Sequence, residues 1–206
     1  MPDDGARMQN ESSTPPPMPD GTKNENPGDI GFWSLIAEDY RTHESAFFSQ
    51  GFWAIFNHRF GNWRMGIRPS LLRLPCSFFY KFWYKIVQIV CGVDVPYTTK
   101  LGRRVKFEHF GGMILVARSV GNDVIIRQNT TFGVRNTQDL NGKPMIGNNV
   151  DIGAGAVLIG HINIGDNAVI GANAVVAKDV PEGALAVGVP AEIREKPSEK
   201  SQIKTP

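Results

Sequence analysis

The sequence predicts a mainly β fold, a parallel β-helix of hexapeptide repeats preceded by a small α-helical segment. Near the end of the chain, aliphatic residues recur every six positions: Ile146, Ile152, Leu158, Ile164, Ile170 and Val176. A strict period of six matches neither an α-helix nor a strand, and it is typical of a chain wound into a β-helix. Glycine follows most of these aliphatic residues, where a tight corner needs it. An aromatic-rich stretch with helical spacing precedes the repeats.

The repeat explains how such a coil is stabilised. Three hexapeptides close one triangular coil of about 18 residues, and stacked coils pair their backbones as in other solenoids. The aliphatic residue of each face points to the axis, where its burial contributes about 1.5–3 kcal/mol. Upstream, four residues are expected to keep the same period: Ile114, Val120, Ile126 and Phe132. Residues 133–145 are polar turn-formers, so we expect an excursion loop there.

Composition divides the chain into four segments. Residues 1–29 and 195–206 are rich in Pro, Ser, Asn and charged residues and contain little to bury, so both are expected to be disordered tails. Residues 30–92 form the helical segment, and residues 93–194 form the β-helix domain.

Two positions mark helix starts in the helical segment. Ser49 is the expected N-cap of a helix that carries aromatic residues at i, i+3 and i+4 spacing. Pro69 is expected to open a longer helix, with a break or a late start at Pro75.

Bulk properties exclude several classes of function. The net charge of +2 is too small to indicate nucleic-acid binding. Two cysteines, Cys76 and Cys91, do not make a disulfide framework, and no secretory signal opens the chain, so a cytoplasmic location is expected. Four scattered histidines and two cysteines provide no metal site.

The most apolar stretch, residues 70–93, is interrupted by a proline and three basic residues, so no membrane-spanning helix is expected. Two arrangements stay open for it. It either packs on its own protein as an amphipathic helix or lies on a membrane surface as a peripheral contact. In the second arrangement four aromatic residues enter the lipid: Phe78, Phe82, Trp83 and Tyr84.

The repeat, its ending VAKDVPEGALAVGVPAEI, the stretch EHFGG and the flanks of the excursion loop together resemble the left-handed β-helix acyltransferases. Within these, the chain is most similar to the serine acetyltransferase family and its exopolysaccharide-biosynthesis O-acetyltransferase relatives, over about residues 31–194. The resemblance implies a left-handed coil and acetyl-CoA as the co-substrate without a metal. Because the helical head is shorter than the one linked to the family's hexameric state, a homotrimer is expected here.

The resemblance also implies site residues. His109 matches the family's catalytic base, which takes the proton of the acceptor hydroxyl, a task suited to neutral imidazole. Asp94, fifteen positions earlier, matches the carboxylate that orients this imidazole. Glu108 matches an acidic residue that helps to hold the acceptor. Four residues match positions along which the family runs coenzyme A: Gly133, Ala154, Gly171 and Lys178.

One position departs from the family pattern. The serine-specific members carry a second histidine before the proline of the excursion loop, whereas this chain has Lys143 there, a candidate acceptor contact. The departure favours a function as an acetyltransferase acting on a hydroxyl of a sugar or polysaccharide precursor. Two alternatives stay open: a serine O-acetyltransferase of cysteine biosynthesis, and a non-catalytic trimeric scaffold.

Overall fold

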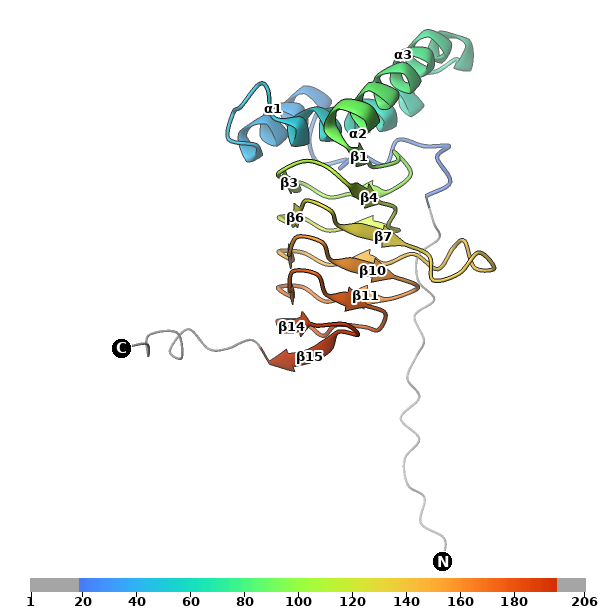
Figure 1. Cartoon of the computed structure of the whole chain (residues 1–206). Helices are drawn as coiled ribbons and strands as arrows, with labels where there is room; N and C mark the ends of the chain where they lie inside the picture. Colours follow the sequence, from blue (N-terminus) through green and yellow to red (C-terminus); the bar gives the residue numbers. More distant parts are fainter. Residues whose placement is uncertain (1–18, 196–206) are drawn as a thin grey trace, which may run out of the picture.

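The computed structural model describes residues 19–195, and it has the predicted fold class: a three-sided parallel β-helix below a helical head (Figure 1). The head contains three α-helices, two 3₁₀-helices and a π-helix: α1 (Phe32–Thr42), α2 (Gln50–Trp63), η1 (Arg64–Gly66), η2 (Ser70–Leu72), α3 (Arg73–Ile86) and η3 (Val87–Cys91).

The expected helix starts agree with the structure. The hydroxyl oxygen of Ser49 accepts a hydrogen bond from the backbone N–H of Phe52 and caps α2. α3 begins after the short helix that follows Pro69, which places Pro75 in its first turn, where a missing N–H removes no helical hydrogen bond. Among the described residues, no helix is both long and apolar enough to cross a bilayer.

The strands form three sheets, one on each side of the prism. Sheet A contains β1 (Val93–Asp94), β4 (Met113–Leu115), β7 (Thr131–Gly133), β10 (Val157–Ile159) and β13 (Val175–Val176). Sheet B contains β2 (Lys100–Leu101), β5 (Ser119–Val120), β8 (Met145–Ile146) and β11 (Asn163–Ile164). Sheet C contains β3 (Lys106–Glu108), β6 (Ile125–Arg127), β9 (Asp151–Ile152), β12 (Val169–Ile170), β14 (Ala184–Val187) and β15 (Glu192–Glu195), the last of which is antiparallel.

The strand register shows the repeat and its interruption. Leu158 lies opposite Val176, 18 positions away, which is one coil of three hexapeptides. Leu158 also lies opposite Phe132, which is 26 positions away, so the coil between them carries eight extra residues. These extra residues form the excursion loop between β7 and β8, seen leaving the prism in Figure 1.

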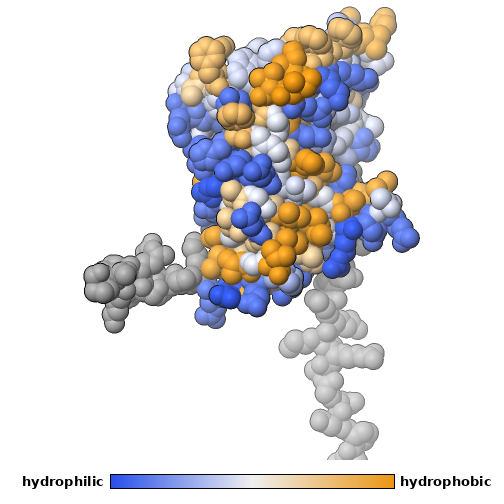
Figure 2. All heavy atoms as spheres, viewed as in Figure 1, coloured by the Kyte–Doolittle hydropathy of each residue, from blue (hydrophilic) through white to orange (hydrophobic). Residues whose placement is uncertain are grey.

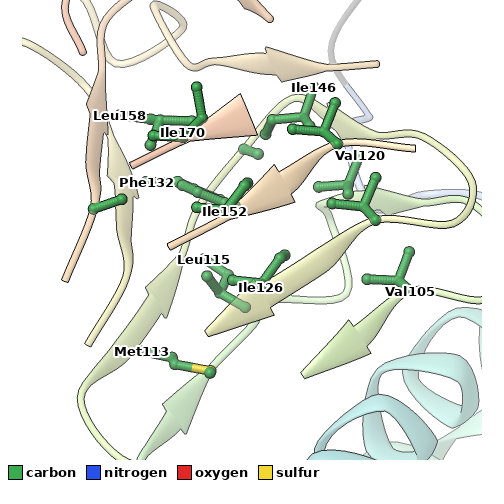
Figure 3. Packing of buried hydrophobic residues seen from close by; sticks show 14 of the residues in the cluster. Val105, Met113, Leu115, Val120, Ile126, Phe132, Ile146, Ile152, Leu158 and Ile170 are labelled. Atoms are coloured by element: carbon green, nitrogen blue, oxygen red, sulfur yellow. The ribbon is translucent and has the colours of Figure 1, made fainter. Parts of the chain in front are cut away.

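Aliphatic side chains from all three sheets fill the axis of the prism (Figure 3). The six aliphatic residues of the clean repeat are all buried. The upstream prediction is wrong at Ile114, which is 47% exposed, because its neighbours Met113 and Leu115 point inward instead. The early coils depart from 18 residues, with Phe107 opposite Ile126, and this shift moves the inward positions of β4 by one.

A buried ion pair joins the head to the prism. The guanidinium of Arg59 on α2 contacts Asp39 of α1 at 2.9 Å and donates hydrogen bonds to the carbonyl oxygens of Leu101 and Gly102. These contacts compensate for the cost of burying both charges.

The segment before α1 differs in part from the expected disorder. Residues 1–18 and 196–206 lie outside the described residues. Residues 19–29 contain no regular element but are hydrogen-bonded to α2, since Asn26 donates to the carbonyl of Arg59 and the backbone of Glu25 donates to Asn62.

Candidate active site

The outer face of sheet A connects the residues that the sequence singles out. Strand pairing lines up one outward residue from each of its five strands, from the head to the far end: Asp94, Ile114, Thr131, Val157 and Val175. The corner between sheets C and A carries three of the expected site residues: His109, Ala154 and Gly171. The corner between sheets A and B follows Gly133 and carries the excursion loop and Lys178. These residues therefore border one face but are spread along its length, whereas Glu108 lies on β3 of sheet C.

Asp94 is held by the helical head. It follows the buried Val93 on β1, so its side chain points outward, where it accepts a hydrogen bond from the hydroxyl of Tyr84 on α3. Burial, followed by this bond and the carboxylate charge, raises the pKa of Tyr84 far above its ordinary value, so the phenol stays protonated and remains a donor. Asp94 also lines a hollow of about 290 Å³ with Gln88, Gly112 and Ile114.

His109 lies in the turn that borders this hollow. It is exposed and adopts a left-handed backbone conformation with φ of 60°, in the turn from β3 to β4. The backbone N–H of Gly111 in the same turn donates to the carbonyl of Cys91, close to the start of β1. In the described part of the chain, no hydrogen bond or ion pair joins His109 to Asp94. The structure brings the two residues to one corner without forming the expected dyad.

Glu108 is already paired with cations. Its carboxylate contacts Lys106 and Arg127 at 3.1 Å each, on the outer face of sheet C. Arg127 also pairs with Asp151 on the next strand, so Glu108 belongs to a row of alternating charges. A cationic acceptor would have to compete with these two partners.

Lys143 closes the excursion loop. It is half-buried just before Pro144, whose carbonyl oxygen accepts a hydrogen bond from the backbone of Arg118. Burial, followed by the charge of Arg118, lowers the pKa of Lys143. The loop itself is compact, because the side chain of Asn136 accepts hydrogen bonds from the backbone of Gln138 and Asp139.

A larger hollow, of about 720 Å³, lies at the far end of sheet A. Its wall combines apolar residues, among them Val175 and Pro190, with three basic residues, Arg135, Lys178 and Arg194, the last of which pairs with Glu192. Sequence reasoning found Lys178 but missed the two arginines, which lie 43 and 16 positions away from it and meet it only when the coils stack. Cations beside an apolar wall fit a ligand that carries phosphates and an apolar arm.

The two expected glycines differ in what surrounds them. A methyl group added at Gly133 would meet no atom within 4 Å, so this glycine borders open space. A methyl group added at Gly171 would lie 2.7 Å from Cγ1 of Val187. Packing between coils therefore accounts for glycine at position 171, and space for a ligand is not needed to explain it.

The histidines outside this site fit structural roles. His43 and His58 are buried in the head, and His161 is exposed at a corner of the prism. Among residues 19–195, no group of three or more His, Cys, Asp or Glu side chains is placed to hold a metal ion.

Comparisons with known proteins agree with this architecture. Residues 143–178 match the family model of the bacterial transferase hexapeptide (six repeats). The chain is 35% identical over 151 residues to a serine acetyltransferase of Mycobacterium tuberculosis, covering 73% of this chain and 63% of that protein. It is 34% identical to the serine acetyltransferase of Escherichia coli K12, of which it covers 52%. The chain thus spans less than two thirds of the length of these curated relatives.

Solved structures give the same result. The soybean serine acetyltransferase apoenzyme is similar with a TM-score of 0.65 and 30% identity, over 79% of this chain and 69% of that one. A serine acetyltransferase in complex with CoA is similar with a TM-score of 0.63 and 30% identity over the same shares of the two chains.

Proposed function

Because the chain belongs to the hexapeptide-repeat transferase family, we propose that it is an acetyl-CoA-dependent O-acetyltransferase. The observation that carries this proposal is the placement of His109, Asp94 and the basic hollow around one face of the prism. A base for an alcohol lies at the head end of that face, and a cation-lined site for a phosphate-bearing donor lies at its far end.

The proposed reaction has His109 as general base. The imidazole removes the proton of the acceptor hydroxyl while its oxygen attacks the thioester carbonyl carbon. The new C–O bond forms, the C–S bond breaks, and the imidazolium returns the proton to the sulfur of the leaving coenzyme A. Asp94, held by Tyr84 near the same turn, is proposed to orient this imidazole when the acceptor is bound.

Coenzyme A is proposed to extend along sheet A. Lys178 and Arg135 would contact its phosphates, and the open space beside Gly133 would admit the pantetheine arm. This assignment keeps Gly133 and Lys178 as donor-binding residues, keeps Ala154 at the opposite edge, and adds Arg135.

The relatives favour L-serine as the acceptor, since those described above are named serine acetyltransferases. Two observations favour a sugar hydroxyl as the second candidate. Lys143 replaces the loop histidine of the serine-specific pattern, and the carboxylate of Glu108 is engaged by Lys106 and Arg127 rather than free for an ammonium group.

Assembly and location complete the proposal. The flat outer face of sheet A, with exposed Ile114, suits the expected homotrimer. Cys76 and Cys91 are free thiols, in keeping with the expected cytoplasmic location. A non-catalytic scaffold remains the alternative from another class.

A thiol-release assay tests the proposal. Acetyl-CoA is supplied with L-serine or with a panel of sugars and glycan precursors, and the freed thiol is measured. We expect release with at least one acceptor and a loss of about 10²-fold or more in His109→Ala, as for removal of a general base. His161→Ala, which removes an exposed histidine elsewhere on the prism, is the control.

The results of this assay distinguish the serine acetyltransferase, the sugar acetyltransferase and the scaffold from one another. Turnover with serine alone would identify the first acceptor, and turnover with a sugar alone would identify the second. Release that is the same in wild type and His109→Ala would refute the assignment of the base, and no release with any acceptor would leave the scaffold.

A further inference from the structure

α3 carries an exposed apolar stripe that the proposed acetyl transfer does not use. Five large hydrophobic side chains recur at intervals of three, four or seven residues along α3 and the two short helices that flank it: Leu71 of η2, Leu74, Phe78 and Phe82 of α3, and Ile89 of η3. We call them the α3 stripe. Their exposed fractions run from 58% to 81%, with Phe78 at 76%. Figure 2 shows hydrophobic residues at the surface of the head, at the upper end of the molecule.

The opposite face of α3 already makes the contacts that attach the helix to the protein. Tyr80 of α3 and Val87 at the start of η3 are buried there, and Tyr84 reaches Asp94. Trp83 packs against Trp53 of α2 at a centroid distance of 5.6 Å. Trp83 and Tyr84, which sequence reasoning placed on a membrane-facing side, therefore face the protein. The side chains of the α3 stripe take no part in this packing and stay exposed.

Charge indicates what covers the stripe. From Ser45 to Val93 the chain contains no Asp or Glu, although its net charge over 206 residues is only +2. Four basic residues stand in and around the stripe without a carboxylate partner among the described residues: Arg68, Arg73, Lys81 and Lys85. The neighbour of Lys85 is the neutral amide of Gln88. An acid-free basic segment is therefore combined with an exposed aromatic stripe.

The combination of unpaired basic residues and exposed apolar side chains distinguishes between a second copy of the chain and a membrane surface as the partner of the stripe. A second copy placed symmetrically on the stripe would bring two sets of unpaired cations together, which is unfavourable. An anionic bilayer surface complements both features, because basic side chains attract its headgroups and aromatic or aliphatic side chains enter the boundary with the acyl chains.

We infer that α3 is a peripheral membrane anchor, which lays the α3 stripe into the interface of an anionic phospholipid bilayer. The helix lies in the plane of the interface and does not span the bilayer, in accordance with its length and its lysines. Since Tyr84 on the inner face of α3 bonds to Asp94, the anchor directly adjoins the candidate active site.

Vesicle sedimentation with the full chain tests the inference. We expect binding to vesicles of phosphatidylcholine with 30% phosphatidylglycerol, weak binding to phosphatidylcholine alone, and a loss of about tenfold when salt is raised from 0.1 to 0.5 M. Phe78→Ser/Phe82→Ser and Lys81→Glu/Lys85→Glu should each lower the partition coefficient by about tenfold or more.

Phe48→Ser is the matched control, because Phe48 is even more exposed but lies between α1 and α2, outside the stripe. Melting curves show that each variant is folded. The inference is overturned if the wild type does not bind anionic vesicles, or if Phe48→Ser weakens binding as much as the stripe variant does. It is also overturned if the stripe variant changes only the oligomeric state in light scattering, which would identify a second copy as the occupant.

Discussion

At the scale of single residues, His58 shows how burial creates a pH dependence. Its imidazole is fully enclosed, donates to the carbonyl of Thr99 at 2.7 Å, and leaves its other ring nitrogen without a partner. Burial, followed by the charge of Arg59, lowers the pKa of His58 to about 3. The unfolded chain takes up this proton near pH 6.5 and the folded chain does not, so the free energy of unfolding falls as pH decreases from about 6.5 towards 3.

The first prediction follows from this difference. Between pH 6.5 and 5, His58 should lower the free energy of unfolding by about 1 kcal/mol per pH unit, and His58→Gln should remove most of that slope. Urea unfolding at pH 7 and pH 5 measures it. His161→Gln should keep the slope of the wild type, and an unchanged slope in His58→Gln would contradict the assignment.

The second prediction concerns the hydrogen bond that the hydroxyl of Tyr84 donates to Asp94. Tyr84→Phe removes the donor to Asp94 and leaves the ring packing in place. We expect unfolding to become easier by about 1 kcal/mol and kcat for acetyl transfer to fall several-fold with KM for acetyl-CoA unchanged, because the carboxylate loses its fixed position. Tyr80→Phe is the control, since Tyr80 stacks on Tyr84 without reaching Asp94. Equal effects of the two variants on kcat would show a merely structural role.

At the scale of elements, glycine serves two purposes in the coils: close packing between coils at Gly171 and open space at Gly133. Gly171→Ala should lower the free energy of unfolding by about 1–3 kcal/mol, because the added methyl group meets Val187 of β14. Gly133→Ala should keep the melting temperature and raise KM for acetyl-CoA, because its methyl group enters open space beside the proposed pantetheine path. Thermal melts and steady-state kinetics on both variants give the comparison. A destabilised Gly133→Ala with normal KM would remove Gly133 from the donor site.

The strands also show where the six-residue period no longer identifies the residues that face the axis. The clean period from Ile146 to Val176 correctly identifies one inward aliphatic residue in each hexapeptide, since the coils there have 18 residues. Met113 and Leu115 could not be identified in this way, because the first coils have different lengths and only the pairing of β4 with its neighbours decides which side faces the axis.

At the scale of the whole molecule, the head and the prism share one buried linkage. Arg59→Met leaves the carboxylate of Asp39 buried without its partner and removes two hydrogen bonds to the prism. We expect a loss of about 3–5 kcal/mol, with the head unfolding before the prism in a thermal scan. Arg104→Met, which breaks only surface pairs, with Asp123 and Glu38, should cost less than about 1 kcal/mol. A single unshifted transition in Arg59→Met would show that the linkage contributes little.

The sequence by itself determined the β-helix, the helical head and the excursion loop. Each of these features follows from a local pattern in the sequence, because every hexapeptide of the coil must bury one aliphatic residue and the pattern breaks where the coil does. Only the tertiary structure decided that Tyr84 holds Asp94, that Arg135 and Arg194 join Lys178, and that α3 leaves one face uncovered. These contacts join residues that are distant along the chain or lie on opposite sides of one helix, and they depend on which coil stacks on which and how the head sits on the first coil.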